Sequence, residues 1–97
     1  MNRKLPGRVQ KDISAFARAH GIEKIILFGS RARGTHSERS DIDLAVAGGD
    51  FDGFYWDVKE KTHSLLMFDL VDLDAGISEE LKAEIERDGV MIYEKAG

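Results

Sequence analysis

The chain of 97 residues has no cysteine, a single proline and no apolar run long enough to span a membrane. Without cysteine, neither a disulfide scaffold nor a thiolate metal site can form. The opening MNRK leads into no apolar segment of the signal-peptide type, so we expect a cytoplasmic protein that makes no contact with a membrane. The length fits one domain, residues 1–97, with one modest core.

A broad excess of basic residues is also missing. Asp and Glu together number 18 against 14 for Lys and Arg, which gives a net charge of −4. A general nucleic-acid binder would normally show a broad basic face, so direct DNA binding is not expected. The basic residues Arg31, Arg33 and Arg39 instead gather just before a pair of aspartates. Basic residues close to acidic ones in the sequence suggest a site that binds an anionic ligand together with a cation.

Hydrophobic periodicity indicates alternating helices and strands. One helix is expected from Leu5, with Pro6 in its first turn and Gly21 at a left-handed cap after its end. Asp50 and Ser78 are expected to cap two more helices. The apolar stripe of the first of these two comprises Phe51, Phe54, Tyr55, Val58 and Leu65. Strands are predicted over residues 24–28, 41–47, 66–73 and 90–93. These elements indicate an α/β domain of about four strands with helices packed on them.

Two like charges lie one residue apart inside an apolar strand. With a side-chain period of two, Asp41 and Asp43 project from the same face and repel each other. A hard divalent ion such as Mg²⁺ would compensate for that repulsion. Asp69 lies in the next apolar strand and can supply a third carboxylate. Three carboxylates on neighbouring strands are what two metal ions need to hold the oxygens of an in-line phosphoryl displacement.

A turn suited to phosphate precedes these aspartates. Gly29 follows a strand and lets the backbone come close to an oxyanion, and Ser30 adds a hydroxyl and an N–H group. A short helix that starts at Ser30 would direct further N–H groups to the anion. Arg31, Arg33 and Arg39 can add bidentate phosphate contacts. The turn therefore suits a polyphosphate, and the aspartates suit its metal ions.

The pattern GS, ten residues and then DID, from Gly29 to Asp43, resembles the signature of the nucleotidyltransferase superfamily related to DNA polymerase β. It is similar in particular to the minimal nucleotidyltransferases of prokaryotes. The resemblance covers residues 25–94, since the segments FDLVDLD and ISEELKAEIERDGVMIYE match the way such chains end. It implies the nucleotidyltransferase fold, which is α+β with a small mixed sheet.

The resemblance also implies a role for each residue of the site. Gly29 and Ser30 would hold the β- and γ-phosphates of a nucleoside triphosphate, with ATP the expected substrate. Asp41 and Asp43 would bind two Mg²⁺ ions. Asp69 would complete the metal site and help deprotonate an acceptor hydroxyl. That hydroxyl would attack the α-phosphorus and release pyrophosphate.

The choice of the third carboxylate stays open between two residues. Asp69 has apolar neighbours on both sides within its strand, and the third acid of the family precedes a similar LVDL, so Asp69 is preferred. Asp72 is the rival, and a separation of three positions places it on the opposite face of a regular strand. Asp74, in the following turn, is expected to be structural.

The resemblance further implies a partner. Minimal nucleotidyltransferases are commonly encoded beside an all-α protein of the HEPN type, typically an RNase toxin, for which they act as antitoxin. Some transfer AMP to a tyrosine of that toxin, and others act mainly by binding. The chain has no room for an acceptor domain, so a partner or a second copy must recognise the acceptor. We expect protein adenylylation, with a non-catalytic binding module as the alternative and a small-molecule nucleotidyltransferase as a third interpretation.

Three further features of the sequence receive interpretations of their own. The spacing from Gly29 to Gly34 fits a P-loop, but Thr35 stands where that motif needs lysine, so a P-loop is rejected. The three histidines show no metal-ligand spacing, which argues against a zinc site. Trp56 falls beside the apolar stripe of its helix, which predicts partial exposure, and contact with a partner is the alternative to a structural role for it.

Overall fold

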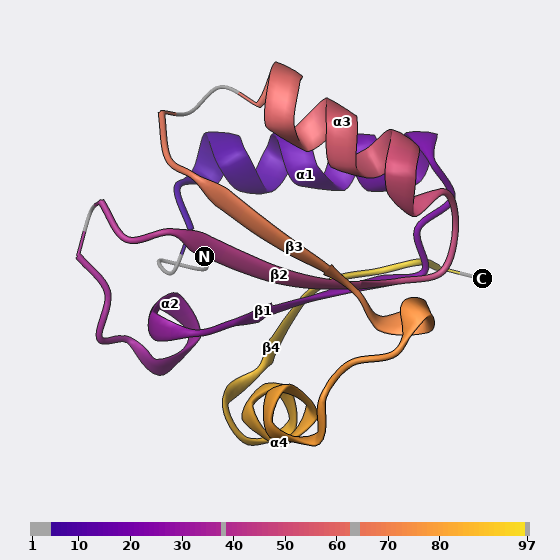
Figure 1. The fold of residues 1–97 in the computed structure, drawn as a ribbon. Helices are drawn as coiled ribbons and strands as arrows, with labels where there is room; N and C mark the ends of the chain where they lie inside the picture. The colour runs from indigo at the N-terminus through magenta and orange to yellow at the C-terminus, as the bar shows by residue number, and fades with distance from the viewer. Residues whose placement is uncertain (1–4, 38, 63–64, 97) are drawn as a thin grey trace.

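The structure is a computed structural model, and it describes residues 5–37, 39–62 and 65–96 (Figure 1). The elements in chain order are α1 (Gly7–Ala19), β1 (Lys24–Phe28), α2 (Ser30–Arg33), β2 (Ile42–Ala47), α3 (Phe51–Lys61), β3 (Phe68–Asp72), η1 (Leu73–Ala75), α4 (Glu79–Asp88) and β4 (Val90–Glu94). No helix within these residues is long and apolar enough to cross a membrane.

The four strands form one mixed sheet in the order β3-β2-β1-β4. β1 is antiparallel to both β2 and β4, whereas β2 and β3 run parallel. Parallel neighbours need a crossover connection, and α3 supplies it between β2 and β3. The predicted α+β fold with a small mixed sheet is confirmed.

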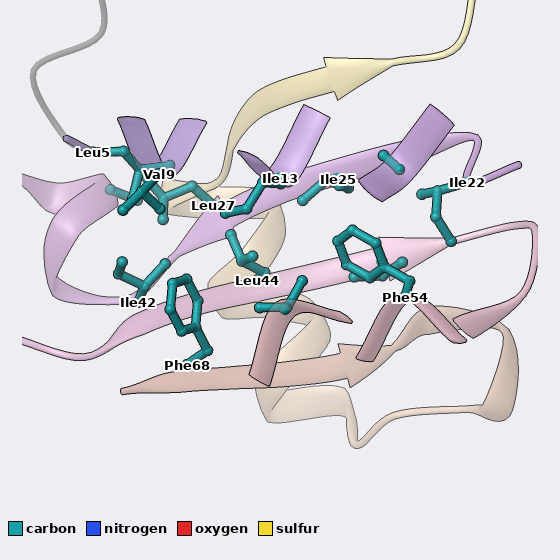
Figure 2. Packing of buried hydrophobic residues seen from close by; sticks show 14 residues of the cluster. Leu5, Val9, Ile13, Ile22, Ile25, Leu27, Ile42, Leu44, Phe54 and Phe68 are labelled. Carbon is teal, nitrogen blue, oxygen red and sulfur yellow. The ribbon is translucent and has the colours of Figure 1, made fainter. Parts of the chain in front are cut away.

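One face of the sheet carries the main core, beneath α1 and α3 (Figures 1 and 2). Alternation along each strand places every second side chain on this face. The fully buried large side chains of this core include Val9, Ile13, Ile25, Leu27, Ile42, Leu44, Val46, Phe54 and Val58. Apolar burial on this face therefore fixes which side chains of β1 and β2 point the other way.

The opposite face is covered in part by α4 (Figure 1). A small buried cluster joins Phe28 of β1, Ala45 of β2 and Ile85 of α4. Asp43 is in register with Phe28, two residues before Ala45, and so lies on this face at the edge of the cluster. α4 thus packs next to the predicted site.

Several local predictions are confirmed. The side chain of Asp50 accepts a hydrogen bond from the Gly53 N–H at 3.1 Å, and that of Ser78 accepts one from the Leu81 N–H at 3.2 Å. Gly21 has a φ of 67° after the end of α1. Ser30 opens a short helix, as expected.

Other boundaries were predicted too widely. The first helix begins at Gly7 with Pro6 as its N-cap, and β2 begins at Ile42. The predicted strand over 66–73 shortens to residues 68–72, because the Asp72 carboxylate accepts a hydrogen bond from the Asp74 N–H and starts a 3₁₀ turn.

Leu65 was wrongly assigned to the apolar stripe of α3, and it is fully exposed. The helix ends at Lys61 because Thr62 adopts an extended backbone. The Thr62 hydroxyl also donates a hydrogen bond to the Val58 carbonyl at 2.7 Å, which satisfies one of the last carbonyl groups of the helix.

Leu44 and Leu65 give a matched pair of leucines for testing this core. Leu44 is 0% exposed, so Leu44→Ala is expected to lower the free energy of unfolding by about 2–5 kcal/mol. Leu65→Ala should change it by less than about 0.5 kcal/mol. Urea unfolding of both variants measures the difference, and equal losses would contradict the packing described.

Candidate active site

The parallel pairing of β2 and β3 brings two of the predicted acids together. Asp43 of β2 is in register with Asp69 of β3, and residues in register in a sheet share a face. Asp41 lies immediately before β2, two positions from Asp43, and is exposed. The predicted carboxylates Asp41, Asp43 and Asp69 therefore lie near one another at the same end of the sheet.

The rival third acid lies elsewhere. Asp72 is in register with Val46, whose side chain belongs to the core beneath α1 and α3, so Asp72 is on the other face from Asp69. Its carboxylate accepts the hydrogen bond from Asp74, which in turn accepts one from the Gly48 N–H at 2.7 Å. The geometry thus favours Asp69 over Asp72, and both Asp72 and Asp74 have structural contacts.

The electrostatics of Asp43 reflect this crowding of acids. The pKa of its carboxyl is raised to about 6, first of all by burial. The charges of Asp69, Asp41 and Glu84 contribute to this rise in the pKa, in that order. Arg33 has the opposite effect and lowers the pKa. Burial and its acidic neighbours together therefore disfavour the negative charge of Asp43.

Gly29 brings the turn that is suited to phosphate, here called the phosphate-type turn, against the carboxylate of Asp43. Its backbone has a φ of 77° and a ψ of −156°, a conformation that is essentially confined to glycine. A Cβ atom at this position would lie 2.2 Å from Oδ2 of Asp43. Only glycine can therefore occupy the junction between β1 and α2 while Asp43 keeps its place.

The turn that follows is closed by backbone hydrogen bonds. The Arg33 N–H donates to the Gly29 carbonyl at 3.1 Å, and the Thr35 N–H donates to the Ser30 carbonyl at 3.0 Å. Gly34, with a φ of 81°, ends α2 in the left-handed conformation. These bonds fix the backbone around Ser30, the residue that follows Gly29.

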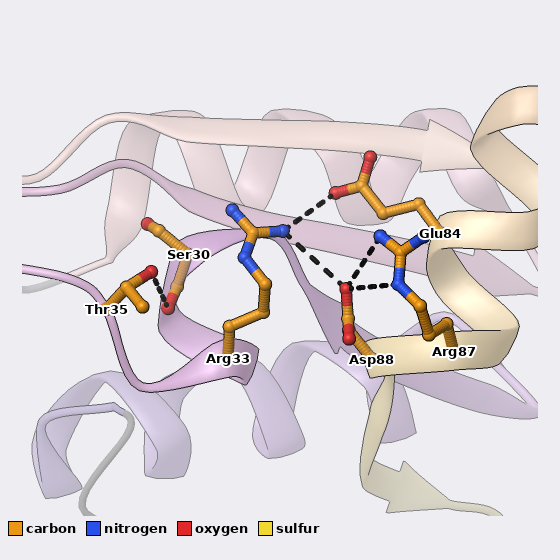
Figure 3. A network of polar contacts seen from close by, with 6 residues as sticks. All are labelled: Ser30, Arg33, Thr35, Glu84, Arg87 and Asp88. Atoms are coloured by element: carbon orange, nitrogen blue, oxygen red, sulfur yellow. Dashed lines mark hydrogen bonds and ion pairs between the residues drawn. The ribbon is translucent and has the colours of Figure 1, made fainter.

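The three predicted arginines have different surroundings. Arg31 is only 3% exposed, and its Nε donates to the Ser40 carbonyl at 3.1 Å, which ties α2 to the residues before β2. Arg33 extends to α4, where it meets the carboxylates of two residues (Figure 3). Arg39 is exposed in the loop before β2. Contact of these three with phosphate remains a prediction.

Sequence reasoning missed the acidic face of α4. Glu84 and Asp88 are four residues apart, so they lie on one side of the helix, and both approach Arg33 (Figure 3). The spacing was visible in the sequence. The face that α4 turns to the site was not, because it depends on how Ile85 packs on the sheet.

The oxygen-only donor set suits magnesium. Across residues 5–37, 39–62 and 65–96, no group of three or more His, Asp or Glu side chains is placed so that it could hold a metal ion by itself. Mg²⁺ does not need a closed cage, because it keeps several waters and binds through one or two carboxylates together with substrate phosphates. One or two of Asp41, Asp43 and Asp69 would suit such a site together with a substrate phosphate, because a cation would relieve the repulsion that, after burial, raises the pKa of Asp43.

Comparison with known proteins places the chain in a family. Residues 10–96 match the family model described as Polymerase beta, Nucleotidyltransferase. This match covers most of the chain, which therefore belongs to the polymerase β nucleotidyltransferase family. The resemblance read from the GS and DID motifs is confirmed, and with it the expected class of enzyme, at the level of the family.

Individual relatives add detail. A segment of 32 residues is 62% identical to a putative protein adenylyltransferase of Methanocaldococcus jannaschii, and it spans 32% of each of the two proteins. A crystal structure of a toxin–antitoxin with AMP-PNP aligns with a TM-score of 0.69 at 29% identity, over 89% of this chain and 73% of the other. The toxin–antitoxin MntA-HepT aligns with a TM-score of 0.60 at 27% identity, over 89% and 70%.

The raised pKa of Asp43 predicts a pH-dependent stability. The folded state binds a proton more tightly than the unfolded state, whose pKa is near 3.8, so stability falls as pH rises from there through about 6. In metal-free buffer at neutral pH, Asp43→Asn should therefore raise the melting temperature, by about 4 °C or more. At a pH of about 4 the difference should shrink, because Asp43 is then protonated in the folded wild type.

The matched control is Asp52→Asn, at an exposed position in the first turn of α3. This change should leave the melting temperature unchanged or slightly lower, since it removes a charge that favours a helix N-terminus. Equal melting temperatures for the wild type and Asp43→Asn at neutral pH would mean that the charge of Asp43 does not destabilise the folded state.

Proposed function

We propose that the chain binds ATP with Mg²⁺ at the Gly29–Ser30 turn and transfers AMP to a hydroxyl group of a partner protein. The observation that carries this proposal is the meeting of three elements: Asp43 beside Asp69 in the parallel pair, with the Gly29 backbone against Asp43. A turn for phosphate and a set of carboxylates for its metal ions then form one site.

The chain's own residues would divide the work as follows. Gly29 and Ser30 hold the β- and γ-phosphates through backbone N–H groups and the serine hydroxyl. Asp41 and Asp43 bind metal, and Asp69 completes the set and accepts the proton of the acceptor hydroxyl. When bound, two Mg²⁺ ions would supply charge neutralisation at the attacking and leaving oxygens.

The transfer exchanges a phosphoanhydride bond of ATP for a phosphoester bond to the acceptor. The acceptor oxygen forms a bond to the α-phosphorus while the bond from that phosphorus to the bridging oxygen breaks. Pyrophosphate leaves with the electron pair of the broken bond, and the hydroxyl proton goes to the carboxylate of Asp69. The product is an AMP ester of the acceptor.

The choice of nucleotide and acceptor is supported by the relatives. AMP-PNP is an ATP analogue, and it accompanies the toxin–antitoxin structure that aligns with this chain. The name of the archaeal relative specifies a protein as the substrate of adenylylation. We infer that the acceptor here is an all-α toxin of the HEPN type, and that the chain acts as its antitoxin.

Binding of ATP provides the direct test of the site. Calorimetric titration should show ATP binding with Mg²⁺ and its loss in EDTA. Asp43→Asn should abolish this binding, and Asp69→Asn should weaken it about tenfold or more. Asp72→Asn is the matched control, because Asp72 lies on the other face of β3, and its affinity should stay that of the wild type. Weakening by Asp72→Asn but not by Asp69→Asn would reverse the assignment of the third acid.

A second candidate function, neutralisation by binding alone, is favoured by exposed apolar side chains. Trp56 is 60% exposed and Met67 66% exposed, and Leu65 is also at the surface. Large exposed aromatic and methionine side chains are enriched at interface centres. Such side chains would serve a binding module whether or not AMP is transferred.

Co-expression with a candidate all-α toxin of the HEPN type separates the two functions. If transfer of AMP is required, Asp43→Asn should fail to restore growth, and the toxin should lack the added mass of one AMP. If binding suffices, Asp43→Asn should restore growth as well as the wild type does, with no added mass on the toxin. Wild-type protein that restores growth without modifying the toxin would contradict catalysis as the mode of action.

A further inference from the structure

Two acidic residues of α4 extend to one arginine of the phosphate-type turn. Oε2 of Glu84 lies 3.5 Å from Nη1 of Arg33, and Oδ2 of Asp88 lies 3.7 Å from the same atom (Figure 3). The three side chains are partly shielded, with 41% of Arg33, 33% of Glu84 and 18% of Asp88 exposed. The pairs are therefore less screened by solvent than fully exposed ones.

Among the ion pairs of the described residues, Glu84 takes part in one, with Arg33, and its charge also attracts Arg87. Asp88 is shared with Arg87, whose Nε and Nη2 donate to Oδ2 of Asp88 at 3.1 and 3.0 Å. These bonds are shorter than the contact of Asp88 with Arg33. Glu84 is consequently the closer partner of Arg33, and unlike Asp88 it accepts no hydrogen bond from Arg87 within the described part of the chain.

The helix that presents Glu84 is firmly placed on the sheet. Ile85, the next residue, belongs to the buried cluster with Phe28 and Ala45. Gly89 ends the helix so close to β1 that a Cβ atom there would lie 2.7 Å from Cγ2 of Ile26. α4 is therefore a fixed support, whereas α2 has only four residues and cannot fix the direction of the Arg33 side chain by itself.

A carboxylate at this position weakens ligand binding by electrostatic repulsion unless a nearby cation compensates for its charge. Glu84 contacts Arg33 of the turn that the Gly29 backbone places against Asp43, so its charge lies at the edge of the predicted metal and phosphate site. An added negative charge repels both a carboxylate cluster and a triphosphate. The contact with Arg33 offsets this repulsion. A guanidinium has five N–H donors, and both ion pairs engage Nη1, so donors on the other nitrogens are left for a ligand.

We propose that Glu84 is a positioning residue, which holds the Arg33 guanidinium at the edge of the Gly29–Ser30 turn so that its remaining donors face the triphosphate. α4 would thereby become part of the nucleotide site without touching the nucleotide. The inference rests on the proposed function, because it assumes that ATP binds at this turn.

The proposal and a purely electrostatic role for Glu84 predict opposite signs. If Glu84 only contributes negative charge, Glu84→Gln should strengthen binding of ATP with Mg²⁺, because a repulsive charge is removed. If Glu84 positions Arg33, Glu84→Gln should weaken it, by about threefold to tenfold. Glu84→Asp keeps the charge but is one methylene too short to reach Arg33, and it should weaken binding similarly.

The experiment is calorimetric titration of ATP with Mg²⁺ into the wild type, Glu84→Gln, Glu84→Asp, Arg33→Ala and the double variant of Arg33→Ala with Glu84→Gln. In the double variant, Glu84→Gln should add no further weakening, because a positioning residue acts only through the group it positions. The matched control is Glu86→Gln, at an exposed position of the same helix, and its affinity should be that of the wild type. Melting curves check that each variant is folded.

Each outcome decides the matter. Unchanged or tighter binding in Glu84→Gln, with the wild type binding normally, overturns the positioning role and leaves the proposed function intact. Additive losses in the double variant also overturn it, because Glu84 would then act independently of Arg33. Absence of Mg²⁺-dependent ATP binding by the wild type overturns the proposed function and this inference with it.

Discussion

The parallel pairing of β2 with β3 is the constraint on which the candidate site depends. It sets Asp43 against Asp69, and a shift of one residue would turn one of them to the other face of the sheet. The pairing in turn requires the α3 crossover, which is held by Phe54 and Val58 in the main core beside α1. Apolar packing on one face of the sheet thus holds like charges together on the other.

Holding these charges together works against folding, and the chain compensates locally. Arg33 opposes the rise in the pKa of Asp43, and Gly29 accepts a backbone conformation that leaves room for the same carboxylate. A protein selected for stability alone would have no reason to keep such an arrangement. Local departures from the most stable solution are expected where a site must bind a ligand.

Much of the fold could be predicted from local patterns, because these depend on neighbours in the chain. Strict alternation identified β2 to within one residue, and the caps at Asp50 and Ser78 formed as expected. Leu65 was misassigned because helical spacing continues past Lys61, and no local pattern shows where Thr62 leaves the helix. Arg31 and Arg33 looked alike in the sequence, yet one is buried and the other extends to α4.

The sequence by itself determined the family, through a match that extends over residues 10–96. It also determined the groups available for chemistry, which are a glycine–serine turn and two aspartates on one face of a strand. These features lie close together in the chain, so their spacing alone conveys them. Tertiary structure decided that Asp69 rather than Asp72 lies beside Asp43 and that Glu84 meets Arg33. Those contacts join residues far apart in the sequence, and only strand register and the packing of α4 on the sheet can set them.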